Sequence, residues 1–271
     1  MSWTPRTISI DGAAVPYLEA GDPRSPHVIV LVHAFPIGVH MWEPVAVPGS
    51  WRALAPALPG FDGVEPPAPG STRVDDYANA VLAWLDALHV QQAVLGGVSM
   101  GGYVTFALWR LAHPRWRGLV LADTRAGADS DQARAGRQKL LDVVAAQGSR
   151  GVAEEMLPKL LGESTRHGQP DLVDRVRRLI ERQTPDGISA AIVRLRDRPD
   201  STGLLPEIHV PTLVMVGDED GVTPPSESEQ MRAQLANAQL VRIPKAGHLA
   251  CMENPLAFNA ALASFLTAFP G

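Results

Sequence analysis

The sequence predicts an α/β fold, in which a mostly parallel, doubly wound sheet carries helices on both faces and receives one helical insertion. Apolar, strand-like segments alternate with segments of helical spacing along most of the 271-residue chain. The alternation breaks once, between about residues 127 and 198, where the sequence is charged and helical in period. Hydrophobic residues make up 45% and charged residues 20% of the chain, a balance that permits a large core.

The first quarter of the chain predicts four strands. Residues 7–10 and 15–19 flank Asp11-Gly12, a strong signal for a hairpin turn. Residues 27–32 (HVIVLV) form a continuous apolar run, as expected of a strand that is buried on both faces. Residues 52–58 predict a weaker strand, so the sheet begins with a hairpin and continues with buried strands.

The next segments alternate regularly. Residues 74–88 carry apolar side chains at helical spacing, and residues 92–97 are strand-like. Residues 102–112 predict a helix that Pro114 ends, and residues 118–122 predict the next strand. Strands that alternate with helices in this way favour parallel pairing.

The insertion has the composition of a helical cap. Four prolines divide it into about four short pieces: Pro158, Pro170, Pro185 and Pro199. We expect a core formed by residues 1–126 and 206–271, and a cap formed by residues 127–205 that lies over the carboxyl edge of the sheet. After the insertion the alternation returns, with strands at residues 212–216 and 240–243 and helices at residues 227–235 and 256–269.

Charge and cysteine content narrow the class of protein. The net charge of −5 and the pI of about 5.9 give no reason to expect binding to nucleic acid or to a membrane. The single cysteine, Cys251, excludes an intramolecular disulfide, and residues 1–11 contain no run that resembles a signal peptide. We therefore expect a cytoplasmic protein. Neither a metal-ligand spacing nor a phosphate-binding glycine loop is present, so no metal or cofactor is expected.

The hexapeptide from Gly97 to Gly102 (GVSMGG) carries the strongest chemical signal. It follows a predicted strand and precedes a predicted helix, which is the context that a G-x-S-x-G nucleophile turn requires. Glycines on either side of Ser99 leave room for a sharp, strained turn that lifts the hydroxyl above the sheet. The pattern indicates that Ser99 is a nucleophile; a simple glycine-serine turn is the alternative.

Three further stretches match a known family in order. His33-Ala34-Phe35-Pro36 follows the buried strand 28–32, Gly217 to Asp220 follows the strand 212–216, and Gly247-His248 follows the strand 240–243. With the serine turn, they make the chain resemble the α/β-hydrolase fold family over nearly its whole length, in the branch of serine esterases and enol-lactone hydrolases. The resemblance implies no metal and no cofactor.

The resemblance implies a triad in the chain order Ser, Asp, His. Ser99 is the expected nucleophile, His248 the base, and Asp220 the acid that orients the imidazole ring. Asp218 and Glu219 compete with Asp220 by proximity. Asp123 is the more serious rival, because it ends the strand 118–122 and some relatives carry the acid there.

The oxyanion hole is expected to be formed by the backbone N–H groups of Phe35 and Met100. Here the chain departs from the family, because Ala34 stands where glycine is usual, and this puts the loop conformation in question. For substrate binding we single out Phe35, His40, Arg125, Met156 and Leu160. Arg125 either binds a substrate carboxylate or pairs with Asp123 or Asp129, and Met156 and Leu160 either line the pocket or join the cap helices.

The expected reaction is hydrolysis of a carboxylic ester of a small to medium substrate through an acyl-serine intermediate. Hydrolysis of an enol-lactone and cleavage of a C–C bond are alternatives within the same fold, and serine at the nucleophile position disfavours dehalogenation. A binding protein without turnover is an alternative of another class. The expected partner is a small ester or lactone; oligomeric state is left open.

Overall fold

A computed structural model describes residues 2–68 and 70–269 of the chain. Within these residues, eight strands form one sheet in the order β1-β2-β4-β3-β5-β6-β7-β8. The strands β1, β2 and β4 pair antiparallel, and every pairing from β4 onward through β3, β5, β6, β7 and β8 is parallel. The predicted α/β class and mostly parallel sheet are confirmed. The bounds of the strands are as follows: β1 Thr4–Ile10, β2 Ala13–Gly21, β3 Val28–Val32, β4 Arg52–Pro56, β5 Ala93–Val98, β6 Trp116–Ala122, β7 Thr212–Gly217 and β8 Ala238–Ile243.

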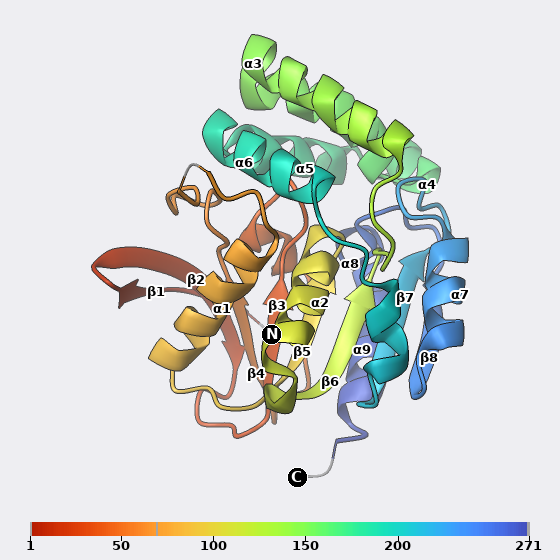
Figure 1. Ribbon diagram of the computed structural model, residues 1–271. Helices are drawn as coiled ribbons and strands as arrows, with labels where there is room; N and C mark the ends of the chain where they lie inside the picture. The colour runs from red at the N-terminus through yellow and green to blue at the C-terminus, as the bar shows by residue number, and fades with distance from the viewer. Residues whose placement is uncertain (1, 69, 270–271) are drawn as a thin grey trace.

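The helices surround this sheet (Figure 1), with α1 and α2 in front of it in that view and α9 behind it. Their bounds are α1 Asp75–Ala87, α2 Met100–Ala112, α3 Asp131–Leu160, α4 Glu163–Gly168, α5 Pro170–Glu181, α6 Pro185–Arg196, α7 Pro225–Gln234, α8 Ala250–Glu253 and α9 Pro255–Leu266, and short 3₁₀ turns lie at Val39–Trp42, His113–Arg115 and Thr202–Glu207. The central strands β3 and β5 are buried along their whole length, as the continuous apolar run predicts.

The insertion α3–α6 lies between β6 and β7 in the chain and across the carboxyl edge of the sheet in space (Figure 1). Its first helix differs from the prediction. Pro158 does not divide two helices, because it sits in the last turn of α3, where the helix is about to end anyway. The break comes instead at Gly148, whose φ of 63° and ψ of −158° interrupt the helix.

The insertion is held to the core by buried polar contacts close to its α3–α4 junction. The backbone N–H of Gly162 donates to Glu253 of α8 at 2.8 Å, and the backbone N–H of His248 donates to the carbonyl of Leu160 at 3.0 Å. At Gly162 an added Cβ would lie 2.8 Å from the backbone nitrogen of Gly247. This junction therefore packs directly on the loop that carries His248, and a side chain at position 162 would push the two apart.

Candidate active site

Ser99 sits on the tight turn between β5 and α2. Its φ of 54° lies in the left-handed region, which a residue with a side chain adopts only under constraint. A Cβ at Gly97 would lie 2.2 Å from the carbonyl carbon of Gly101, and one at Gly101 would lie 2.1 Å from the carbonyl oxygen of Val32. The glycines of the hexapeptide thus permit the turn, as the sequence predicts.

The structure brings the three predicted triad residues together. His248 Nε2 lies 2.7 Å from Ser99 Oγ, and His248 Nδ1 lies 2.8 Å from Asp220 Oδ2. All three side chains are buried, and Ser99 retains 8% of its exposed surface. An imidazole held in this way by a carboxylate can accept the proton of the serine hydroxyl.

The carboxylate of Asp220 is held by its own loop. Its Oδ1 accepts hydrogen bonds from the backbone N–H groups of Val222 (2.8 Å) and Thr223 (3.0 Å), and its Oδ2 accepts one from the Thr223 hydroxyl at 2.7 Å. Burial by itself raises the pKa of Asp220, but His248 and the donors from Thr223 outweigh it and leave this pKa below its ordinary value. Asp220 is therefore ionised when His248 takes up a proton.

The sequence reasoning did not single out Thr223. Its hydroxyl also lies 3.3 Å from His248 Nδ1, so it bridges the acid and the base. The signal was present in the spacing, because a threonine three residues after an aspartate at a strand end favours this local turn.

The rival acids have other partners. Asp123 is fully buried beside Asp220, and it accepts hydrogen bonds from the backbone N–H groups of Gly217 (2.8 Å) and Ala250 (3.2 Å). Burial raises the pKa of Asp123 well above its ordinary value, and the negative charge of Asp220 raises it further. Asp123 thus ties the end of β7 to the start of α8 rather than contacting His248.

The two neighbours of Asp220 also face elsewhere. Asp218 pairs with Arg242 at 2.7 Å on the exposed surface. Glu219 accepts hydrogen bonds from the backbone N–H and the hydroxyl of Ser164, at the start of α4. Of the candidate acids, Asp220 is the one placed against the imidazole.

The loop after β3 supplies the other side of the site. Within the described residues, neither the Phe35 nor the Met100 backbone N–H donates a hydrogen bond to another protein group. Free N–H groups are what an oxyanion hole requires. Ala34 is not among the residues of positive φ, so its methyl group brings no backbone strain to this loop.

His33 lies beneath that loop and has a structural role. Its Nδ1 lies 3.1 Å from the carbonyl of Ala34, and its Nε2 accepts a hydrogen bond from the backbone N–H of Leu58 at 3.2 Å. Burial lowers the pKa of His33 below its ordinary value. A neutral ring that joins the ends of β3 and β4 stabilises the loop without taking part in proton transfer.

The residues singled out for substrate binding do not all come together. Arg125 and Met156 line one pocket between α3 and the core, with a volume of about 670 Å³. Leu160 is buried and offers its carbonyl to the backbone of His248, and Phe35 is 3% exposed. His40 lies elsewhere: it contacts Glu43 at 2.7 Å and lines a separate surface hollow with Asp62 and Arg182.

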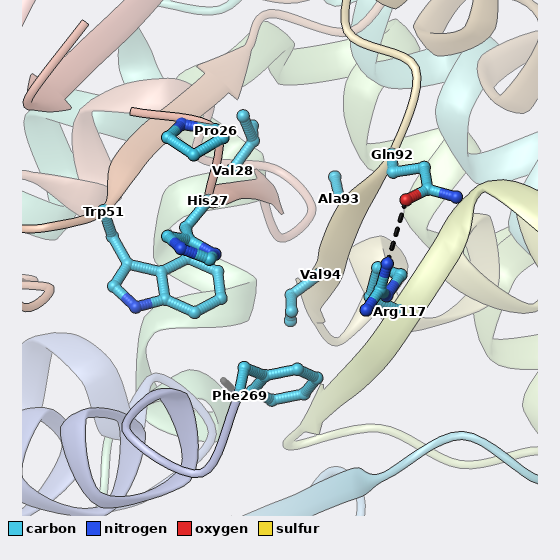
Figure 2. Close-up of a pocket in the computed structure, with 9 residues that line it drawn as sticks. All are labelled: Pro26, His27, Val28, Trp51, Gln92, Ala93, Val94, Arg117 and Phe269. Atoms are coloured by element: carbon cyan, nitrogen blue, oxygen red, sulfur yellow. Dashed lines mark hydrogen bonds between the residues drawn. The ribbon is translucent and has the colours of Figure 1, made fainter. Parts of the chain in front are cut away.

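A second pocket, of about 340 Å³, opens at the opposite edge of the sheet, where the parallel strands begin (Figure 2). Figure 2 shows His27 and Trp51 on one side, and Gln92 hydrogen-bonded to Arg117 at 3.0 Å on the other. None of the side chains drawn there is a serine, cysteine or carboxylate, and the triad lies at the other ends of these strands. We therefore assign the chemistry to the carboxyl edge.

Neither a metal site nor a membrane segment emerges from the part of the chain that the structure describes. Across residues 2–68 and 70–269, no three His, Cys, Asp or Glu side chains cluster so that they could hold a metal ion. The helices of those residues lack the combination of length and apolar character that spanning a bilayer needs.

Comparison with known proteins agrees with this geometry. Residues 27–255 match the family model described as alpha/beta hydrolase fold. A thermophilic esterase from Thermogutta terrifontis, solved with malate bound, superposes with a TM-score of 0.90 and 35% identity over 97% of this chain and 98% of that one.

Two relatives of known activity match over most of their length. The 3-oxoadipate enol-lactonase 2 of Acinetobacter baylyi is 26% identical over 202 residues, which cover 74% of this chain and 73% of that protein. The pimeloyl-[acyl-carrier protein] methyl ester esterase of Neisseria meningitidis serogroup A is 25% identical over 253 residues, which cover 90% and 78%.

Proposed function

The chain belongs to the α/β-hydrolase fold family and is an esterase-type serine hydrolase, and we propose that it cleaves a carboxylic ester of a small to medium substrate through an acyl-serine intermediate. The observation that carries this proposal is the continuous set of contacts from Ser99 Oγ through His248 to Asp220, at 2.7 and 2.8 Å.

The geometry supports a two-step reaction. His248 Nε2 accepts the proton of Ser99 as its oxygen attacks the ester carbonyl, and Asp220 stabilises the imidazolium that forms. The backbone N–H groups of Phe35 and Met100 receive the developing oxyanion. His248 then gives the proton to the departing alkoxide, so that an alcohol leaves and an acyl-serine remains. A water molecule, deprotonated by His248, attacks the acyl group and releases the acid and free Ser99.

A lactone is the second candidate substrate, since one relative is an enol-lactonase. The chemistry is the same, because a lactone is a cyclic ester. The products distinguish the two: a lactone opens to a single hydroxy or keto acid, whereas an open-chain ester yields an acid and an alcohol.

Labelling with a fluorophosphonate, followed by mass mapping of the modified peptide, tests the activation of Ser99 without a known substrate. We expect one phosphonyl group per chain on Ser99, absent from protein that is denatured before labelling and from Ser99→Ala. An adduct on another residue, or no adduct under conditions where a known esterase is labelled fully, would overturn the proposal.

A further inference from the structure

The charged residues that line the pocket between α3 and the core are mainly positive, although the whole protein carries a net negative charge. The chain has a net charge of −5, yet the pocket is lined by Arg125, Arg137, Lys139 and Lys159 and by one acidic residue, Glu155. Glu155 is already paired with Lys159, its neighbour one turn along α3. A pocket of this kind attracts negative charge and concentrates anionic ligands.

The two halves of α3 form the roof and wall of this pocket. Ala133, Arg137, Leu140 and Val143 are spaced three or four residues apart, so they share one face of the helix, and Gly136 lies next to Arg137. The kink at Gly148 turns the second half of α3, and Met156 joins the same pocket from there. Small residues leave space beside the cations, and Leu140, Val143 and Met156 offer an apolar wall.

The buried carboxylate of Asp129 accepts hydrogen bonds from three nearby arginines. Its Oδ1 accepts a hydrogen bond from Arg125 Nη2 at 2.7 Å, and its Oδ2 accepts one from Arg137 Nε at 3.1 Å. Arg198 donates to Oδ1 at 2.5 Å. Burial alone raises the pKa of Asp129, but Arg137 and Arg198 outweigh it and leave this pKa below its ordinary value. Three guanidinium groups therefore share the carboxylate of Asp129, and the negative charge of Glu227 also acts on Arg125.

This leaves donors of the two pocket arginines free. Within the described residues, Arg125 donates only its Nη2–H, and its buried Nε has no partner. Arg137 donates only its Nε–H there, although each guanidinium carries five N–H donors. The side chains of Arg125 and Arg137 are 21% and 19% exposed and line the pocket, so their remaining terminal N–H groups are available to a ligand there, whereas Nε of Arg125 is buried.

We propose that the preferred substrate carries a negatively charged group besides its scissile ester, and that Arg125 and Arg137 bind this group in the pocket under α3. The proposal rests on the proposed function, since it names the substrate class of the same site. Guanidinium forks match the oxygens of a carboxylate or a phosphate, and the apolar wall suits the carbon chain that links the anion to the ester.

The pocket adjoins the triad through two short connections. Arg125 follows Thr124, whose hydroxyl donates to the backbone carbonyl of Ser99 at 2.9 Å. Val222, which also lines the pocket, donates its backbone N–H to the carboxylate of Asp220. The anion site and the reacting serine therefore lie at the same edge of the sheet.

The test compares matched charged and neutral esters. On the acyl side these are 4-nitrophenyl hydrogen glutarate and 4-nitrophenyl hexanoate; on the alcohol side they are 4-carboxyphenyl butanoate and its methyl ester, assayed for cleavage of the butanoate. We expect the wild type to prefer the charged member of at least one pair in kcat/KM by about ten-fold. Arg137→Gln should remove most of that preference, because it should raise KM for the charged ester much more than KM for the neutral ester.

Arg150→Gln is the matched control. Arg150 lies on the same helix, is largely exposed and pairs with Glu154 at 3.3 Å, so its loss should not alter the preference. Asp129 keeps Arg125 and Arg198 as partners in the Arg137 variant, and circular dichroism checks that this variant folds. A wild type without preference in either pair, or a preference that survives Arg137→Gln, would overturn the anion site.

Failure of the proposed function looks different. It would appear as no hydrolysis of any of the four esters and no fluorophosphonate adduct. Calorimetric titration with glutarate and, in parallel, with inorganic phosphate tests the anion site independently of turnover. Binding of either that is lost in Arg137→Gln and kept in Arg150→Gln supports the site, and the tighter binder identifies the group; no binding of either overturns it.

Discussion

At the carboxyl edge of the sheet, both ring nitrogens of His248 and both carboxylate oxygens of Asp220 meet partners within the protein. Beneath α3, Arg125 and Arg137 share one carboxylate, line a pocket of about 670 Å³ and keep N–H groups that have no partner within the described residues. Both regions are built around a buried aspartate. The first satisfies its polar groups internally, whereas the second leaves donors for a ligand.

This difference follows from what each region has to do. Proton transfer needs an imidazole fixed in one tautomer and orientation, which a complete set of internal hydrogen bonds provides. Selection of a substrate needs donors that gain a partner only when the ligand binds. In our interpretation the core carries the reaction, and the pocket between the core and the insertion carries the selectivity.

The largest expected effect is loss of the nucleophile. Ser99→Ala should lower kcat by on the order of 10⁴ or more, because only the oxyanion donors and substrate binding then remain. Steady-state hydrolysis of 4-nitrophenyl hexanoate measures it, with circular dichroism as the control for folding. A rate close to that of the wild type would exclude Ser99 as the nucleophile.

The next effect separates the two carboxylates at neighbouring strand ends. Asp220→Asn should lower kcat by about 10³–10⁴-fold, because the amide no longer selects the productive tautomer of His248. Asp123→Asn should lower kcat far less and should instead reduce the free energy of unfolding by about 1–3 kcal/mol, because an amide nitrogen replaces a buried acceptor. The reverse ranking in kcat would identify Asp123, which follows β6, as the acid that orients His248.

The pH dependence of stability should also differ between Asp220 and Asp123. The pKa of Asp220 is lowered, so its contribution is present above the ordinary value of 3.8 and is lost as the pH falls through its folded pKa. The pKa of Asp123 is raised, so its contribution is complete below 3.8 and declines as the pH rises toward its folded pKa.

Denaturant unfolding across this range measures these contributions. The destabilisation caused by Asp123→Asn should shrink as the pH rises above 3.8, since the wild type loses the contribution of Asp123 there. A difference between wild type and variant that stays constant with pH would mean that Asp123 does not titrate on folding.

The smallest effect concerns the charged surface of the insertion. Arg175 of α5 pairs with Glu43 at 2.7 Å, and their side chains are 34% and 46% exposed. Arg175→Ala should therefore cost about 1 kcal/mol or less. Arg194→Ala, in contrast, removes a 3%-exposed partner of Asp76 and should cost on the order of 3 kcal/mol. Equal losses in thermal unfolding would contradict this ranking.

Much of the fold could be read from local pattern. The run at residues 28–32 and the serine turn at Ser99 depend on neighbours in sequence, so the sequence alone predicts both β3 and the turn after β5. The short helix α8 and the three 3₁₀ turns of the described chain were missed, because segments of three to six residues carry no periodic signal. The break in α3 was misplaced for a related reason: a proline in a last turn is tolerated, and an internal glycine marks no boundary by itself.

The amino-acid sequence alone predicts the α/β class and the nucleophile turn, because both depend on local patterns of a few residues. The order of serine, aspartate and histidine along the chain came from the resemblance to a known family. The sequence favoured Asp220 and left Asp123 as a rival, since Asp123 directly follows β6 and Asp220 lies in the loop after β7; the packing shows that Asp220 is the one that contacts His248. The tertiary structure also decided that Arg125 and Arg137, twelve positions apart, meet at Asp129, while His40 lies at a separate hollow. Contacts of this kind depend on how the insertion packs over the sheet, and residue spacing along the chain does not encode that packing.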